Sequence, residues 1–127
     1  GFNPSDWDMD GDSLVPLMNG DDAGWKNFAL VEHLAHGTDR ALVMVRRGSW
    51  KLTYGHADPP ELELYDLETD PGEFNNLAND PAHAPKQQEM WDLLMREWGE
   101  PAEINQQVMQ SQADRGVIRA ADGGKIF

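Results

Sequence analysis

Short stretches of apolar or alternating residues, each closed by a turn signal, fill the middle of the chain. Residues 40–55, "RALVMVRRGSWKLTYG", join an apolar run, a Gly-containing turn and an alternating run, which predicts a β-hairpin. The segment 61–67, "ELELYDL", also alternates, and the apolar segment 28–37, "FALVEHLAHG", ends at a glycine. These patterns predict four short strands in an antiparallel sheet, and alternation places Glu32 and His33 on opposite faces of the first strand.

From Pro81 onward the apolar spacing becomes that of a helix. Gly99 and Pro101 close the helix predicted over 84–99, because neither residue continues a regular helix. A further helix is predicted over 102–121, where apolar residues are too sparse to bury it against its own domain, so we expect an arm. The positions that recur at helical spacing in the first of these helices are Met90, Leu93, Leu94 and Trp98.

A shorter helix is predicted over 12–20, "DSLVPLMNG", near the start of the chain. Asp12 or Ser13 can cap its N-terminus, and Gly20 can end it. The residues that would share one face are Leu14, Leu17 and Met18. Together these elements predict an α+β fold, in which a small four-stranded antiparallel sheet packs against a C-terminal helix and an extended helical tail follows.

The chain is strongly acidic, with 23 Asp and Glu residues against 10 Lys and Arg residues and a net charge of −13. A field of this sign repels phosphate backbones and anionic lipid headgroups, which argues against nucleic-acid and membrane partners. Acids and bases balance beyond residue 100, so the acidic excess lies in residues 1–100. No apolar run approaches the roughly 20 residues that span a bilayer.

The chain has no cysteine, which excludes disulfides and thiolate metal sites within it and fits a reducing compartment. Its first residues lack the basic and apolar regions of a signal peptide. We therefore expect a cytoplasmic location. Because the chain does not begin with Met, we also expect it to be a piece of a longer protein.

The acidic string near the start resembles half of a calcium-binding loop. Asp6, Asp8 and Asp10 alternate and a glycine follows, as in the first six positions of a helix–loop–helix calcium site. Position 12 of that loop requires a bidentate Glu, but Leu17 stands there, one residue after Pro16. The pattern therefore favours a solvated acidic loop that leads into the short helix.

A second cluster of chemical groups lies at the end of the first strand. Glu32, His33, His36 and Asp39 are residue types that bind metals or exchange protons. Three ligands at a productive spacing are not evident, so polar groups at a strand end are the alternative. Arg46, Arg47 and Lys51 form a basic run that can hold an anion or pair with surrounding acids.

Five tryptophans offer either aromatic binding surface or core packing. Trp91 and Trp98 lie seven residues apart on the predicted helix, and Trp50 alternates within a strand, which favours core positions. Trp7 and Trp25 lie in predicted loops and are free for other roles.

Three motifs occur in order along the chain: "DGDSLVPLMNG" (10–20), "MVRRGSWKLTY" (44–54) and "ELYDLETDPGEFNNLA" (63–78). They resemble the "DG-x-SL-x-PLL-x-G" helix, the C-terminal "R-x-G-x-x-K" hairpin and the "LYDL-x-x-DP-x-E-x-x-NLA" segment of type I sulfatases. These enzymes belong to the alkaline-phosphatase-like superfamily. Within the family, residues 31–48 and the tail after Trp98 are most similar to choline sulfatases.

The resemblance implies a C-terminal part of an enzyme that hydrolyses choline sulfate to choline and sulfate. The family uses a formylglycine nucleophile and a divalent cation such as calcium, both held by the N-terminal catalytic part. This chain has no "C/S-x-P-x-R" motif from which formylglycine is made, so we expect the fragment alone to be inactive. The alternatives are a related phosphonate or phosphate monoester hydrolase, another sulfatase, or a free-standing, non-catalytic interaction module.

The resemblance also divides the chain and assigns one site residue. Residues 1–26 correspond to a linker and short helix from the catalytic body, 27–99 to the sulfatase C-terminal subdomain, and 100–127 to a C-terminal extension. Glu32 occupies the position of an acidic residue that faces the choline cation, while no catalytic residue or metal ligand is assigned. The expected partners are the N-terminal catalytic part and further copies of the enzyme, joined through the tail as an oligomerisation arm.

Overall fold

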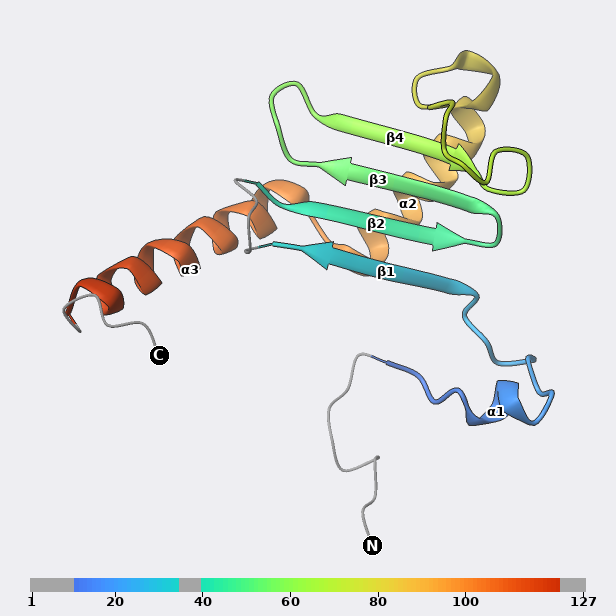
Figure 1. Cartoon of the computed structure of the whole chain (residues 1–127), viewed down its shortest axis with the longest axis horizontal. Helices are drawn as coiled ribbons and strands as arrows, with labels where there is room; N and C mark the ends of the chain where they lie inside the picture. The colour runs from blue at the N-terminus through green and yellow to red at the C-terminus, as the bar shows by residue number, and fades with distance from the viewer. Residues whose placement is uncertain (1–10, 35–39, 122–127) are drawn as a thin grey trace, which may run out of the picture.

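The computed structural model describes residues 11–34 and 40–121, which form a four-stranded sheet and two long helices (Figure 1). This arrangement confirms the predicted α+β fold. In chain order the elements are α1 (Val15–Met18), β1 (Phe28–His33), β2 (Leu42–Arg47), β3 (Trp50–Gly55), β4 (Glu61–Asp66), the 3-10 helix η2 (Pro81–His83), α2 (Ala84–Trp98) and α3 (Pro101–Ala121).

The sheet is an antiparallel meander in which every strand pairs with its neighbours along the chain, in the order β1-β2-β3-β4. The predicted hairpin is β2–β3, where Arg47 pairs with Trp50 across a two-residue turn. Gly48 opens that turn with a φ of +59°, in the left-handed region that glycine enters without steric cost.

One face of the sheet is covered by α2, and the hydrophobic core lies between them (Figure 1). Val45, Leu52 and Leu64 stand in register across β2, β3 and β4, and all three are fully buried. Burial of each such side chain stabilises the fold by about 1.5–3 kcal/mol. The four helix positions predicted from their spacing are all buried on the inner side of α2: Met90, Leu93, Leu94 and Trp98.

The first strand is shorter than predicted. β1 ends at His33 rather than at residue 37, and residues 35–39 lie outside the described part of the chain. The helix predicted over 84–99 does end at Gly99, whose φ of +105° is incompatible with further right-handed helix.

The short helix α1 is a single turn rather than the nine residues predicted. Its N-cap position is Leu14, without a side-chain cap, so the predicted cap by Asp12 or Ser13 is wrong. The Ser13 hydroxyl instead accepts a hydrogen bond from Val15 N–H at 3.3 Å, and Asp12 pairs with Lys26 at 2.9 Å. These contacts close the loop around α1 but leave its apolar side chains exposed.

The second long helix, α3, projects away from the sheet, as Figure 1 shows. Pro101 is buried and Ile104 packs against the core, and Asn105 accepts a hydrogen bond from Ala41 N–H at 3.4 Å. Farther along, Met109 and Val117 are 44% and 70% exposed. The first turns therefore anchor α3. Within the described ranges, neither long helix is apolar enough to cross a membrane.

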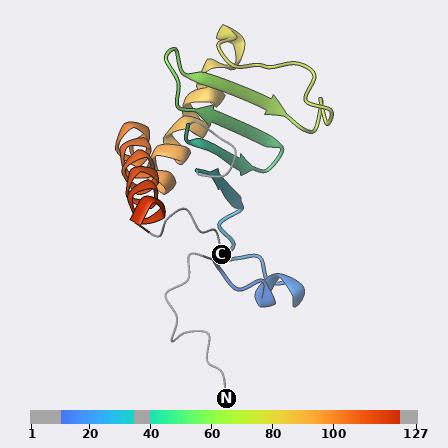
Figure 2. The same ribbon diagram turned by 60° about the vertical axis from the view of Figure 1, so that its left-hand side comes forward.

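The opposite face of the sheet carries no helix among the described residues (Figure 2). Val31 of β1 lies on this side and is 54% exposed, and Met44 of β2 stands beside it in register. Apolar side chains on an uncovered face are a surface that another part of a protein can cover.

Candidate functional site

Glu32 lies in β1, an edge strand, directly opposite Val43 of β2. Val43 in turn pairs with Tyr54 of β3, and both of these residues are buried on the side of α2. Because directly paired residues point to the same face, Glu32 continues this row on the helix-covered face. His33 pairs with Leu42 and occupies the other face, as the alternation predicts.

The row ends at the sheet edge, where Glu32 is exposed to solvent. Within residues 11–34 and 40–121, its carboxylate forms no hydrogen bond or ion pair. No cation in this part of the molecule therefore neutralises its negative charge by direct contact. The side chain is placed where a positively charged group can approach it.

Of the other predicted metal or proton-transfer residues, His33 alone lies in the described part of the chain, on the opposite face of β1 from Glu32. His36 and Asp39 lie outside the described residues, as do Asp6, Asp8 and Asp10 of the acidic string. Among the residues that the structure describes, no group of three or more His, Asp or Glu side chains is placed to hold a metal ion. These residues therefore do not fit the divalent cation that the resemblance implies, and the chain lacks the motif for formylglycine.

The basic run is divided between the two faces of the hairpin. Arg46 and Lys51 pair in register on one face, and Arg47 lies on the other. Lys51 forms a salt bridge with Glu73, while Arg46 Nε donates a hydrogen bond to the carbonyl of Gly48 at 3.2 Å. The prediction that the run pairs with surrounding acids is thus confirmed for Lys51.

The four tryptophans in the described part of the chain follow the predicted division between core and loop. Trp98 is buried, and Trp50 and Trp91 are half-buried against the core. Trp25 lies half-buried in the loop before β1, whereas Trp7 falls outside the described residues.

Asn76 fastens the loop after β4 to the outer edge of the sheet. Its Oδ1 accepts hydrogen bonds from Leu64 N–H at 3.0 Å and Ala78 N–H at 2.8 Å, and its Nδ2 donates to the Leu62 carbonyl at 3.2 Å. The backbone N–H of Leu77 also donates to the Leu64 carbonyl at 2.8 Å. These bonds satisfy backbone groups of β4 that would otherwise form an open edge.

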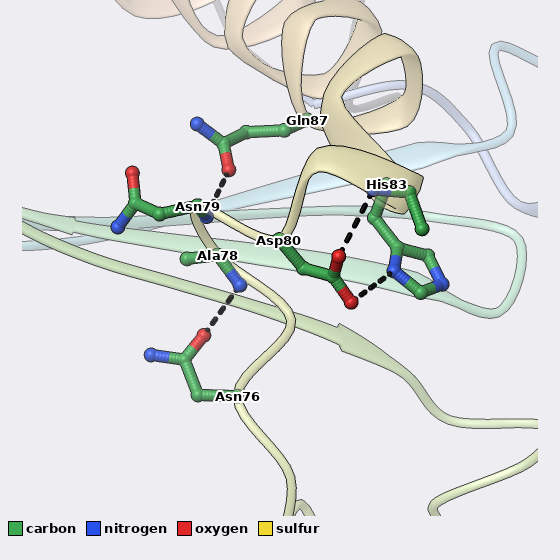
Figure 3. A network of polar contacts seen from close by, with 7 residues as sticks. Asn76, Ala78, Asn79, Asp80, His83 and Gln87 are labelled. Atoms are coloured by element: carbon green, nitrogen blue, oxygen red, sulfur yellow. Dashed lines mark hydrogen bonds and ion pairs between the residues drawn. The ribbon is translucent and has the colours of Figure 1, made fainter.

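The same loop positions the start of α2 (Figure 3). Asn79 N–H donates to Gln87 Oε1 at 2.7 Å, and Asp80 accepts a hydrogen bond from Ala82 N–H at 2.9 Å. Asp80 Oδ2 also lies 3.2 Å from His83 Nδ1. The bond from Ala82, followed by that from His83, lowers the pKa of Asp80.

In the turn between β4 and this loop, carboxylates also accept hydrogen bonds that hold the backbone in place. Asp70 accepts a hydrogen bond from Asn75 N–H at 2.8 Å, which is the main cause of its lowered pKa. The Ser49 hydroxyl, and then Glu68 N–H and Thr69, lower the pKa of Asp66. In the motif at 63–78, side-chain oxygens therefore accept hydrogen bonds from backbone N–H groups and so hold the loop in its conformation. The sequence did not indicate the bonds of Asn76 to the sheet edge.

A cavity that the sequence did not indicate lies at one end of the sheet, where the β3–β4 connection meets the junction of α2 and α3. Its volume is about 410 Å³, and Tyr54, His56, Trp91 and Glu100 are among its lining residues. These residues come from distant positions, so no local pattern could have predicted that they meet.

The family model described as "N-sulphoglucosamine sulphohydrolase, C-terminal" matches residues 3–100 of the chain. The chain is 36% identical over 115 residues to the choline-sulfatase of Rhizobium meliloti (strain 1021), a match that covers 88% of this chain and 22% of that protein.

Two solved structures share this fold. The structure of a complex with the substrate D-glucosamine-2-N,6-O-disulfate gives a TM-score of 0.64 at 27% identity and covers 74% of this chain and 21% of that one. The phosphonate monoester hydrolase of Agrobacterium radiobacter gives 0.56 at 26% identity, over 71% and 20%. The chain thus spans about a fifth of the length of these proteins. Since the family model covers more than half of the chain, the chain belongs to the family of C-terminal sulfatase domains that this model describes.

Proposed function

We propose that this chain is the C-terminal portion of a sulfuric-ester hydrolase that converts choline sulfate to choline and sulfate. The 36% identity to a choline-sulfatase over most of the chain is the observation that carries this proposal. The formylglycine nucleophile and a divalent cation such as calcium belong to residues outside this chain. The chain itself is inactive and contributes to the substrate pocket and to assembly.

Within this function, Glu32 faces the choline cation. A quaternary ammonium offers positive charge but no hydrogen-bond donor, so an ionised carboxylate suits it better than a neutral acceptor. Support comes from the exposed position of Glu32 on an edge strand and from the absence of an ion pair to it within the described residues.

The partner of this chain is the N-terminal catalytic part of the same enzyme. Support comes from large apolar side chains that the described residues leave uncovered: Met18 is 82% exposed, Val31 54% and Phe74 87%. These side chains lie on α1, on the helix-free face of the sheet and in the loop after β4. Burying them against a catalytic body recovers about 25 cal/mol for each Å² of apolar surface removed from water.

The test uses the complete enzyme that contains this chain and measures KM separately for choline sulfate and for an aryl sulfate that carries no cationic group. Glu32→Gln should raise KM for choline sulfate by about three- to ten-fold, because an opposite charge near the cation is lost, and leave KM for the aryl sulfate unchanged. Glu63→Gln, on the other edge strand, is the matched control and should leave both substrates unaffected. Equal effects of Glu32→Gln on the two substrates would contradict the role of Glu32.

The hydrolase proposal itself is tested by the unsubstituted enzyme. Turnover of choline sulfate well above that of aryl sulfates supports it, and failure to hydrolyse choline sulfate refutes it. A second candidate is a phosphonate or phosphate monoester hydrolase, which the shared fold with the Agrobacterium radiobacter enzyme favours. Under that alternative, a phenylphosphonate monoester is hydrolysed faster than any sulfate ester.

A further inference from the structure

Three of the ten residues that line the cavity at the α2–α3 junction carry rings, namely Tyr54, His56 and Trp91. The rings of Tyr54 and Trp91 meet edge-to-face, with centroids 5.3 Å apart and planes at 68°. The imidazole of His56 lies 6.3 Å from the Tyr54 ring, and the Tyr54 hydroxyl is 3.0 Å from His56 Nδ1. This hydrogen bond and the tilted ring contacts hold three rings around one space.

Tyr54 is almost completely buried, but Trp91 is only half-buried. Tyr54 is therefore fixed by the core, where the centroid of the Trp98 ring lies 6.3 Å from that of Tyr54. Part of the Trp91 surface remains open to the cavity, where an apolar or cationic group can contact it.

The charge of the cavity comes from Glu100, which joins α2 to α3. Neither Lys nor Arg lies among the lining residues, all of which belong to the described part of the chain. Burial and then the negative charge of Glu100 raise the pKa of Tyr54, so the field of this carboxylate extends to the ring. Two amides, from Gln87 and Gln88, complete the polar lining.

We propose that this cavity is a binding site for a small alkylammonium cation, whose apolar groups contact Trp91 and whose charge lies close to Glu100. An aromatic face attracts a cation through its quadrupole, and the carboxylate of Glu100, with no Lys or Arg among the lining residues, adds charge attraction. An anion would meet repulsion from Glu100. A neutral ligand would gain apolar contact and hydrogen bonds but no attraction between charges.

This site is separate from the proposed role of Glu32. Glu32 is not among the lining residues, and buried Val43 stands between it and Tyr54 in the same cross-strand row. The cavity therefore does not depend on ester hydrolysis, and each proposal can fail alone.

The test is a titration of the full chain with tetramethylammonium chloride at constant ionic strength, followed through the indole N–H signal of Trp91 in a ¹⁵N–¹H spectrum. Choline and 3,3-dimethylbutan-1-ol provide a charged and an uncharged ligand of nearly the same shape, and methylammonium tests for a cation that can also donate hydrogen bonds. Saturable shifts with the cations, and much weaker ones with the alcohol, are expected. Equal affinity for the alcohol, or no shift with any cation, would overturn the proposal.

Three variants locate the site. Glu100→Gln should weaken tetramethylammonium binding by about two- to five-fold, the effect of one exposed ion pair, and Glu103→Gln in the next turn should not. Trp91→Leu should remove the cation preference, and in this variant the backbone N–H signals of the lining residues Gln88 and Ala102 replace the lost indole signal as the readout. Circular dichroism first checks that each variant folds. In Glu100→Gln and Glu103→Gln, the indole N–H signal of Trp91 then reports the affinity for tetramethylammonium. If Trp91→Leu does not fold, the contrast between Glu100→Gln and Glu103→Gln decides, and equal effects of these two substitutions contradict the site.

Discussion

The side-chain oxygen of Asn76 accepts a hydrogen bond from the backbone N–H of Leu64 at 3.0 Å, across 12 positions of sequence. With the Nδ2 bond to Leu62, this contact makes Asn76 act as a substitute for a neighbouring strand. The loop after β4 therefore closes one edge of the sheet and fixes the approach of α2.

Replacing Asn76 by Ala should lower the free energy of unfolding by about 1–2 kcal/mol, because three hydrogen bonds are lost and the Leu64 N–H is left without its partner. Urea denaturation followed by circular dichroism measures this loss. Asn75→Ala is the matched control, since its side chain makes one long contact of 3.4 Å with Asp70. The control should stay within about 0.5 kcal/mol. Equal losses in the two variants would contradict the strand-like role of Asn76.

Stability should fall in acid because Asp66, Asp70 and Asp80 have lowered pKa values in the folded chain. A carboxyl whose folded pKa lies below its unfolded value, about 3.9, stabilises the fold above that pH. This contribution is lost as the pH falls through the folded pKa.

Asp80→Asn should reduce both the stability at pH 7 and its decline toward pH 3, because the amide cannot ionise. Urea midpoints at pH 7, 5 and 3 for both proteins measure the difference. Asp92→Asn, on the exposed side of α2, serves as the control substitution. Parallel pH curves for the original chain and Asp80→Asn would show that Asp80 does not contribute.

Trp98 should tolerate Phe far better than Ala. Its ring is 9% exposed and lies 6.3 Å from Tyr54, but its indole N–H has no hydrogen-bond partner among the described residues. Phe keeps most of the packing and removes the unpaired donor, so its cost should stay below about 1.5 kcal/mol. Ala should cost about 3–5 kcal/mol by opening a cavity. Chemical denaturation compares them, and a Phe variant as unstable as Ala would reveal an essential role for the N–H.

The projecting part of α3 should mediate association between copies of the enzyme. Deleting residues 110–127 keeps Pro101, Ile104 and Asn105 in place and so retains the anchor of the helix. We expect a lower mass by light scattering with an unchanged circular dichroism melting curve for the sheet. Val117→Lys should weaken association in the same direction, because Val117 is 70% exposed and available to a partner. If both variants keep the assembly mass of the unsubstituted enzyme, the role of α3 in association is refuted.

The strands and the helix α2 could be predicted because the spacing of their apolar residues is a local sequence pattern. The spacing of Met90, Leu93 and Leu94 predicts the buried side of α2, and alternation predicts the strands. The length of α1 was not predictable from capping residues alone. The Ser13 hydroxyl accepts a hydrogen bond from Val15 N–H, as a capping residue does, but the helix begins only at Val15, after Leu14, and ends at Met18. The edge role of Asn76 depends on a contact that forms only once the sheet exists.

The candidate sites also differ in whether a local sequence pattern could predict them. Glu32 could be placed on a face by alternation, although its substrate role and the boundaries of the three segments remain predictions. The meeting of Tyr54 with Trp91 and Glu100 could not be predicted, because it depends on the docking of α2 and on the direction in which α3 leaves it.

The meander has a kinetic consequence. Every strand pairs with the strand that precedes or follows it, so each pairing closes only a short loop, and the entropy lost on closure grows slowly with loop length. Contacts between sequence neighbours favour fast folding, and the β2–β3 hairpin needs to close only two residues. We therefore expect the β2–β3 hairpin to form early in folding. Substitutions in its turn should slow refolding more than substitutions at the exposed end of α3.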